Sequence, residues 1–487
     1  MNEAAIRTVA RSRTRRASGR VGRRSRLAEE NGLTEKARLA WPVRLLLISL
    51  FMPWTWHFGP LALSPYRLVL LTMVVPCLFF WITGRTGRIR SADVTLLLYC
   101  LWCSISLLVN HGYEASLQPA GILFVETAGA YLIARYYIRN ADNFRDMIRL
   151  LFLIVVILLP FAVLEAVTRR NVLLEFCSLI LPVLPTTDNL PVLPTTDNAL
   201  RWGLARVRSV VEHPILFGVV CGSIFALAHL VLGCGEKAGR RWFRTGIVGA
   251  TAFLSLSAGP ITALAAQALL LCWNWFLREY AYRWRLLLAM VSTMWGCISL
   301  VANRSVPNLY LSYFSFDESS AYFRILIWTF GTESVLNHPF FGVGLNSWDR
   351  PSWMPPSIDM FWLIHAVLYG IPAAILMLLT LLLPLLSIGL LKGLNDRLEQ
   401  YRAGYVIAMT GFFLVGWTVH FWSATYVLFL FLLGSGLWLL DVNPTGRDST
   451  DTRPSLPARR LKARPPPRNR PQAGGPDGMV TRIARSR

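Results

Sequence analysis

The sequence predicts an all-α, polytopic membrane protein, a bundle of about 12 transmembrane helices. The chain has 487 residues, of which 54% are hydrophobic and only 16% are charged, whereas about a quarter of the residues in a soluble domain are charged. Its mean hydropathy is +0.45. The formal net charge of +22 does not indicate nucleic-acid binding, because the basic residues are concentrated in two tails and in short loops between apolar runs.

Composition divides the chain into three parts. Residues 1–40 are polar and rich in Arg, and residues 442–487 are rich in Pro and Arg, so both are expected to be disordered, basic cytoplasmic tails. Residues 41–441 form the predicted transmembrane domain. Within it, residues 168–209 and 303–360 are expected to form two large periplasmic loops.

The predicted transmembrane domain consists of apolar runs separated by short polar segments. A span needs about 20 apolar residues, so the first and the seventh run are short for one. The predicted spans are Pro42–Trp56, Tyr66–Thr83, Val94–Asn110, Gly121–Ile138, Leu150–Val167, Val210–Leu232, Gly246–Leu256, Ile261–Leu277, Leu286–Ala302, Phe361–Leu391, Gly404–Phe421 and Thr425–Leu440.

The distribution of basic residues predicts the orientation of the chain. When the N-terminus is placed inside, the inner loops are basic, and several outer connections, such as His111–Pro119, contain no Lys or Arg. The positive-inside rule therefore places both tails in the cytoplasm. The two large outer loops carry arginines against this rule, which indicates that these arginines bind something.

Two further features receive no functional role. The cysteines lie almost all inside apolar runs, and Cys100 and Cys103 have a zinc-like spacing without a partner pair, so packing residues are expected and no metal site. The nonapeptide LPVLPTTDN occurs at Leu181–Asn189 and again at Leu190–Asn198, where its Pro and Asp-Asn content predicts turns.

Three arginines, Arg201, Arg206 and Arg208, precede the sixth span on the outer side. Guanidinium groups bind phosphate oxygens bidentately and keep their charge, so these residues are candidates for binding a phosphate-bearing lipid. Anchoring to lipid headgroups is the alternative explanation. Glu212 and His213 follow closely and are either ion-pair partners or parts of the same site.

The second large loop is expected to contain an amphipathic helix at Ser320–Leu336, lying on the membrane surface between spans 9 and 10. Arg324 falls outside its apolar stripe, and His338, just after the helix, is an accessory candidate. The stripe follows three- and four-residue steps and consists of Tyr322, Ile325, Leu326, Thr329 and Phe330.

His365 lies about one turn into the predicted tenth span. An imidazole can act as a general base near pH 7 without much tuning of its pKa, although a histidine at this depth can also be an interfacial anchor. No Asp-x-Asp sequence occurs on the outer side, so a reaction without a metal is expected.

Four sequence blocks occur in the order found in a known family. They are RVRSVVEHP, SLSAGP, FRILIW followed by NHPFFGVG, and HAVLYGIP. In this order they resemble the O-antigen ligase and polymerase superfamily of bacterial inner-membrane enzymes. The resemblance implies inverting glycan transfer from an undecaprenyl-diphosphate carrier, without a nucleotide sugar or a metal. It also implies that Arg206 holds the donor diphosphate, that His365 assists the acceptor hydroxyl, and that Arg324 matches the arginine before the Trp in the helical stretch.

Two positions depart from the family pattern. The chain has Ser-Ala-Gly at 257–259 where the family commonly has Ser-Arg-Gly, and His-Ala at 365–366 where the ligases have His-Asn. The missing arginine would have to be replaced by Arg201, Arg208 or Arg324. The sequence DMFWLIHAVLYGIP resembles exopolysaccharide-type members more than lipopolysaccharide ligases.

The sequence therefore predicts a multi-pass glycosyltransferase of the bacterial inner membrane. It would transfer an undecaprenyl-diphosphate-linked oligosaccharide to a sugar hydroxyl at the periplasmic face, in exopolysaccharide or O-antigen synthesis, without a cofactor. One alternative is ligation onto lipid A-core. Another is transport of lipid-linked sugars, although the repeated halves common in transporters are not visible here. The enzymatic interpretation requires Arg206 and His365 to meet at one cleft.

Overall fold

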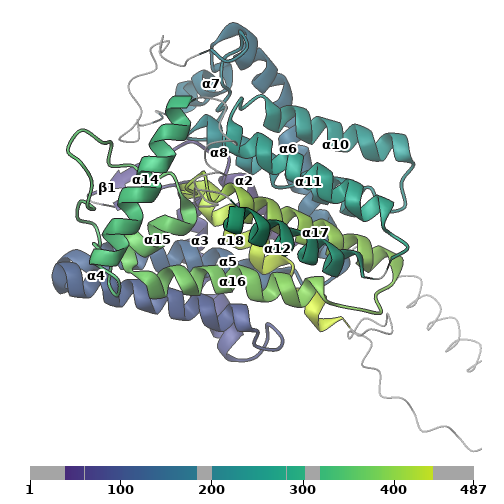
Figure 1. Ribbon diagram of the computed structural model, residues 1–487. Helices are drawn as coiled ribbons and strands as arrows, with labels where there is room; N and C mark the ends of the chain where they lie inside the picture. The colour runs from purple at the N-terminus through teal and green to yellow at the C-terminus, as the bar shows by residue number, and fades with distance from the viewer. Residues whose placement is uncertain are drawn as a thin grey trace, which may run out of the picture. The chain divides into compact units, whose positions relative to one another are not determined.

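The computed structural model describes residues 39–442, except 60, 182, 184–199, 281 and 302–317. The predicted tails, most of the duplicated nonapeptide and the start of the second large loop lie outside the described residues. The described part of the chain is almost entirely helical (Figure 1), and its strands form one antiparallel hairpin. This confirms the all-α class.

In chain order the elements are α2 (Trp41–Ser49), β1 (Trp56–Phe58), β2 (Leu61–Leu63), α3 (Pro65–Ile82), α4 (Ser91–Phe124), η1 (Val125–Gly129), α5 (Ala130–Tyr137), α6 (Ala141–Thr168), α7 (Val172–Ile180), α8 (Pro214–Gly222), α9 (Phe225–Leu227), η2 (Ala228–Leu232), α10 (Ala238–Phe253), α11 (Ala258–Phe276), α12 (Arg283–Val301), α14 (Glu318–Asn337), α15 (Phe361–Tyr369), α16 (Ile371–Gly389), α17 (Asp396–Val415), α18 (Ser423–Ser435) and η3 (Leu437–Asp441).

Within the described residues, seven helical segments are long and apolar enough to cross a membrane, which indicates a multi-pass membrane protein. The predicted count of twelve is not confirmed, because several predicted spans correspond to shorter or more polar helices such as α2 and α10. The seven segments are Pro65–Ile82, Ser91–Tyr137, Ala141–Thr168, Pro214–Leu232, Arg283–Val301, Ile371–Gly389 and Ser423–Asp441.

The third and fourth predicted spans belong to one helical run, Ser91–Tyr137. The predicted connection between them, His111–Pro119, is helical rather than an open loop, and the run kinks at Gly112, whose φ is 74°. Glycine adopts this left-handed φ readily because it has no Cβ. Apolar content located the two apolar runs as helical, but it could not show that the polar link between them is also helical.

The predicted tenth span, Phe361–Leu391, is two helices that meet at Gly370. Gly370 has a φ of 86°, and a Cβ at this position would lie 1.9 Å from the carbonyl oxygen of Phe340. Only glycine permits so close an approach of two backbones. Nearby, the backbone N–H groups at 343–344 donate to the carbonyls at 367–368. These contacts join the turn after α14 to the end of α15.

The helix predicted at Ser320–Leu336 is confirmed as α14, but its predicted apolar stripe is not its buried face. The buried residues are Arg324, Ile327, Gly331 and Ser334, which also recur at three- and four-residue steps. The stripe was wrong because α14 packs against α15 and the segment between them. Contacts with the protein, rather than with a membrane surface, therefore select the inner face of this helix.

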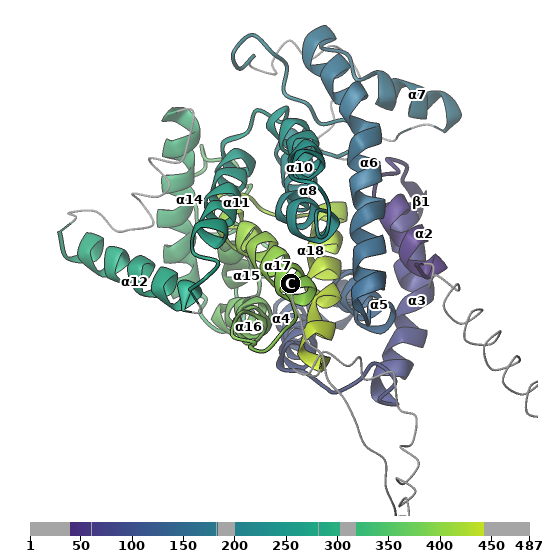
Figure 2. The same cartoon turned by 90° about the vertical axis from the view of Figure 1, so that its right-hand side faces the viewer.

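The centre of the bundle is formed by α18, which is buried along its length and packs on α5. A buried ion pair joins α4 to α5, with Arg135 Nε 3.3 Å from Asp93 Oδ1, and the Tyr131 hydroxyl donates to the same carboxylate. Buried charges persist when they are paired in this way. By contrast, α12 lies at the margin of the bundle (Figure 2), and no residue of its apolar window is buried.

Candidate functional site

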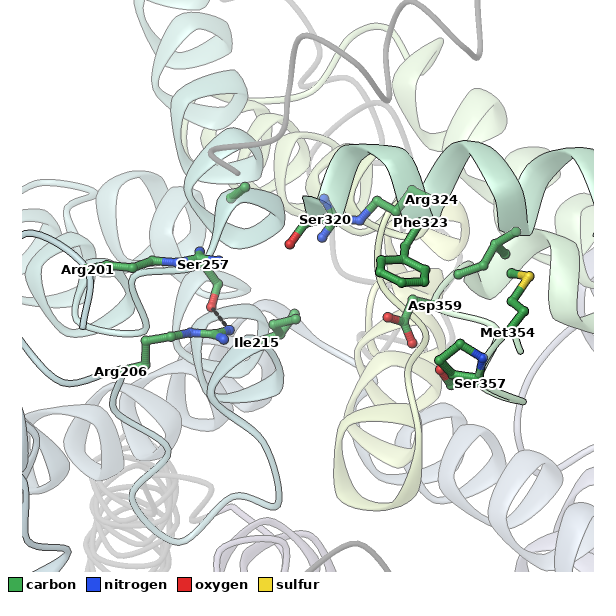
Figure 3. A pocket seen from close by; sticks show the side chains of 13 residues that line it. Arg201, Arg206, Ile215, Ser257, Ser320, Phe323, Arg324, Met354, Ser357 and Asp359 are labelled. Atoms are coloured by element: carbon green, nitrogen blue, oxygen red, sulfur yellow. Dashed lines mark hydrogen bonds between the residues drawn. The ribbon is translucent and has the colours of Figure 1, made fainter. Parts of the chain in front are cut away.

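A cavity of about 270 Å³ lies between the start of α8, the start of α11, α14 and the segment that leads into α15. Arg201 and Arg206 approach it from one side, Asp359 lies on the opposite side, and Arg324 enters from α14 between them (Figure 3). The apolar part of its wall includes Ile215, Phe323, Ile327 and Met354. The cavity therefore combines several cationic groups with one carboxylate.

Arg206 lies in an irregular segment, 204–208, between α7 and α8. Ala205 and Val207 are buried and Arg206 between them is partly exposed. The backbone N–H groups of the two residues after Val207 each donate a 3.0 Å hydrogen bond to the carboxylate of Glu165 at the end of α6. These bonds fix the direction in which the Arg206 side chain leaves the segment.

The Arg206 guanidinium is positioned against the start of α11. Its Nη2 donates to Ser257 Oγ at 2.9 Å. Burial, and then the charges of Arg201 and Arg324, lower the pKa of Arg206 to about 10, so the group stays protonated at neutral pH. Neighbouring like charges repel one another, and a bound anion would relieve that repulsion.

The other two cavity arginines come from different parts of the chain. Arg201 Nη1 donates to the Leu256 carbonyl at 2.8 Å, and its backbone pairs with Leu204 across a turn. Gly203 in that turn has a φ of 81°. Arg324 belongs to the buried face of α14 and is only 8% exposed. Two separated parts of the chain, the connection before α8 and the helix α14, thus bring guanidinium groups to one cavity.

The N-terminus of α11 opens on the same cavity, because Ser257 precedes the helix and Ala258 is its first residue. The first N–H groups of a helix carry partial positive charge and bind anions. The Ser257 hydroxyl donates to the Ser255 carbonyl at 2.9 Å, which leaves its oxygen as the acceptor for Arg206. The helix terminus therefore adds to the positive potential of the arginines.

Asp359 reaches the cavity from the segment between α14 and α15. Trp348 Nε1 donates to the Pro356 carbonyl at 2.9 Å, and the Phe361 N–H donates to the Val419 carbonyl at 3.2 Å. Both sides of Asp359 are therefore held by backbone contacts. The position of its carboxylate is set by the fold rather than by an unattached loop.

The Asp359 carboxylate points into the cavity, and no hydrogen bond joins it to the other residues drawn in Figure 3. Burial raises the pKa of Asp359, and the charge of Arg324 opposes that increase. Arg324 thus favours the ionised carboxylate. The Asp359 carboxyl group therefore forms the acidic side of the cavity.

The structure brings together three predicted site residues, Arg201, Arg206 and Arg324. Arg208, which was also predicted to bind the diphosphate, is partly exposed but does not line the cavity. Its backbone N–H instead helps to fix the segment by donating to Glu165. Of the three residues expected to replace the missing arginine, Arg201 and Arg324 line the cavity and Arg208 does not.

His365 does not line the cavity, so the predicted meeting of Arg206 and His365 at one cleft is not seen in this structure. The imidazole is 5% exposed. Its Nδ1 lies 2.9 Å from the Tyr99 hydroxyl oxygen, and its ring packs edge-on against Phe361. A general base must come within hydrogen-bond reach of the hydroxyl that it deprotonates, and the bundle encloses this imidazole. Its catalytic role stays a prediction.

Two of the accessory candidates have structural contacts outside the cavity. His213 precedes α8, and its Nδ1 accepts a hydrogen bond from the Ile215 N–H at 3.2 Å. Burial and the charges of nearby arginines lower the pKa of His213 to about 4, so it is neutral at pH 7 and acts as a helix cap. His338 follows α14, and its Nε2 lies 3.7 Å from a carboxylate oxygen of Asp349.

Glu212, the third accessory candidate, also lies outside the cavity lining and is expected to make stability depend on pH. Burial raises its pKa to about 7, against a hydrogen bond from Ser423 and the charge of Arg67, while Glu126 adds to the increase. Because the folded-state pKa lies above the ordinary value of 4.5, stability decreases as pH rises through about 7. In thermal unfolding experiments in detergent, the stability of Glu212→Gln relative to the wild type should increase as the pH rises from about 5 to 8. A constant difference across that range would contradict this assignment.

The sequence interpretation missed Ser257 and Asp359 as site residues. Ser257 was noticed only as part of a departure from the family pattern. Asp359 could have been found from its position directly before the predicted tenth span. Acidic residues contribute little to the orientation of a membrane protein, so an acidic residue at this place calls for another explanation. Its proximity to Arg324 depends on the packing of α14 and could not be read from the sequence.

No family model and no curated protein matches the chain. Among the described residues, no three His, Cys, Asp or Glu side chains are grouped so that they could hold a metal ion, and a metal-free reaction stays a prediction. Cys100 and Cys103 are buried free thiols, as expected for packing residues.

Proposed function

We propose that the protein is a membrane-embedded glycosyltransferase whose donor is a glycan linked to a polyprenyl diphosphate. The observation that supports this most strongly is the convergence of Arg201, Arg206 and Arg324 on one cavity. Guanidinium groups bind phosphate oxygens in a planar, bidentate manner. With the N-terminus of α11 beside them, they form a site suited to a group with two adjacent phosphates.

The chemistry requires mainly positive charge at the leaving group. A polyprenyl diphosphate is a good leaving group, and its departure from the sugar places negative charge on the phosphate oxygens. Arginines that are already positioned stabilise that charge without reorganising during the reaction. The acceptor oxygen attacks the anomeric carbon from the face opposite the diphosphate, which inverts its configuration.

The finer parts of the proposal come from sequence patterns. The donor carrier is undecaprenyl diphosphate, the cavity faces the periplasm, and both tails are cytoplasmic, with about twelve spans in the bacterial inner membrane. The acceptor is the sugar end of an exopolysaccharide or an O-antigen chain, and lipid A-core is the alternative. The resemblance of the four sequence blocks supports this assignment, and the positions of the arginines are compatible with it.

The test is turnover by the purified full-length protein in nanodiscs, in the presence of EDTA. The substrate is the undecaprenyl-diphosphate oligosaccharide extracted from the strain that carries the gene. We expect products of two or more repeat units and release of undecaprenyl diphosphate, at a rate that EDTA does not change. Transfer only to added lipid A-core would support the ligase alternative, and an absolute need for a divalent metal would contradict the mechanism.

A further inference from the structure

The cavity has two ends of opposite charge. Arg201 and Arg206 lie at one end, against the N-terminus of α11, and the Asp359 carboxylate lies at the other (Figure 3). Arg324 enters between them from α14. This separation is more than a set of neutralising ion pairs, because Arg206 donates to a serine hydroxyl rather than to the carboxylate.

The charges indicate how a donor would be oriented. Like charges repel, so the diphosphate takes the arginine end, away from Asp359. The anomeric carbon, which is attached to the outer phosphate, then lies between the arginines and Asp359.

The acceptor hydroxyl needs a group that can take its proton. Among the described residues that line the cavity, Asp359 is the one side chain that can accept a proton at neutral pH, because the rest are arginine, serine or apolar. His365 is enclosed by the bundle and absent from the lining. The placement of Asp359 opposite the leaving-group end is what in-line displacement requires.

We propose that Asp359 is the general base of the transfer reaction, a role that rests on the proposed function. The acceptor oxygen forms a bond to the anomeric carbon while the bond from that carbon to the phosphate oxygen breaks. The proton of the acceptor hydroxyl passes to the Asp359 carboxylate. The electron pair leaves with the diphosphate, which the arginines hold, and Asp359 returns its proton to water before the next transfer.

The first experiment compares Asp359→Asn with the wild type in the nanodisc assay. Asparagine preserves the shape but cannot accept the proton, so the turnover rate should decrease by about 10²- to 10⁴-fold. The Kd for undecaprenyl diphosphate should stay equal or decrease, because a negative charge has been removed from the cavity. Asp359→Glu should recover part of the rate.

A pH profile separates catalysis from a structural role. Among the described residues, the charged groups that line the cavity with Asp359 are Arg201, Arg206 and Arg324, and an arginine side chain keeps its charge. The wild-type rate should therefore decrease on the acid side as Asp359 is protonated, and the residual rate of Asp359→Asn should lack that decrease. Asp349→Asn, a charge-matched control on the same segment but outside the cavity, should keep the wild-type rate and profile.

Two results would overturn the assignment of Asp359. One is a rate for Asp359→Asn within about tenfold of the wild type, below the contribution of a general base. The other is loss of undecaprenyl diphosphate binding in this variant, which would make Asp359 a structural residue. Both leave the proposed function standing, whereas an inactive wild type would count against the proposed function itself.

Discussion

Replacing Arg206 with alanine is expected to lower glycan transfer by at least about a hundredfold, because a positioned donor to a developing anion contributes about 10²- to 10³-fold. The Arg206 guanidinium lies between Arg201, Arg324 and the start of α11, so its loss removes charge from the centre of the diphosphate site. The amount of folded protein should not change. Turnover in nanodiscs and the polymer length on gels from cells measure the effect.

Two arginine variants serve as controls for this result. Arg206→Lys keeps the charge but loses the bidentate fork, so it should retain part of the activity. Arg208→Ala removes an arginine from the same segment but outside the cavity lining. Its transfer activity should decrease by no more than about tenfold, well below the decrease caused by removing a positioned donor. Polymer of wild-type length from Arg206→Ala would remove the basis of the mechanism.

Replacing Gly370 with alanine is expected to destabilise the protein by more than about 4 kcal/mol. Gly370 has a φ of 86°, and the new Cβ would lie 1.9 Å from the Phe340 carbonyl oxygen and 3.0 Å from the Phe341 nitrogen. Both neighbours are backbone atoms, so neither can move aside by changing a rotamer. The yield of monodisperse protein and the thermal unfolding midpoint in detergent should both decrease strongly.

Gly246→Ala is the matched control for that variant. Gly246 lies within α10, and a Cβ there would meet no heavy atom within 4 Å. Alanine in a helix is favoured over glycine by up to about 1 kcal/mol, so the control should be neutral or slightly stabilising. If Gly370→Ala were as stable as Gly246→Ala, the break between α15 and α16 would be wrong.

The sequence predicted the helices better than their ends and breaks. Apolar runs are sufficient to find α3 and α6, because a helix that crosses a membrane must be apolar along its length. They could not separate α15 from α16, since the residues on both sides of Gly370 are equally apolar. That break is produced by the backbone of Phe340, a contact between distant segments that periodicity does not report.

The candidate site was predicted in part, for a physical reason that differs between residues. Arg201 and Arg206 could be found because arginines on the outer side oppose the positive-inside rule. His365 was selected by its place one turn into the predicted tenth span and in a sequence block, and neither shows that the bundle encloses its imidazole. The position of Asp359 in the sequence could have suggested it, but its proximity to Arg324 arises only when α14 packs beside the segment before α15.

The central claim is that the arginines of the cavity hold a diphosphate, and a structure of the full-length protein with undecaprenyl diphosphate tests it most directly. We expect both phosphate groups of the ligand to lie in the cavity. Arg206 should be within hydrogen-bond distance of an oxygen of at least one phosphate group, and Arg201 and Arg324 should also contact the diphosphate. The carboxylate of Asp359 should lie on the side away from the phosphates. A diphosphate bound elsewhere on the protein, with the cavity free of it, would contradict the account.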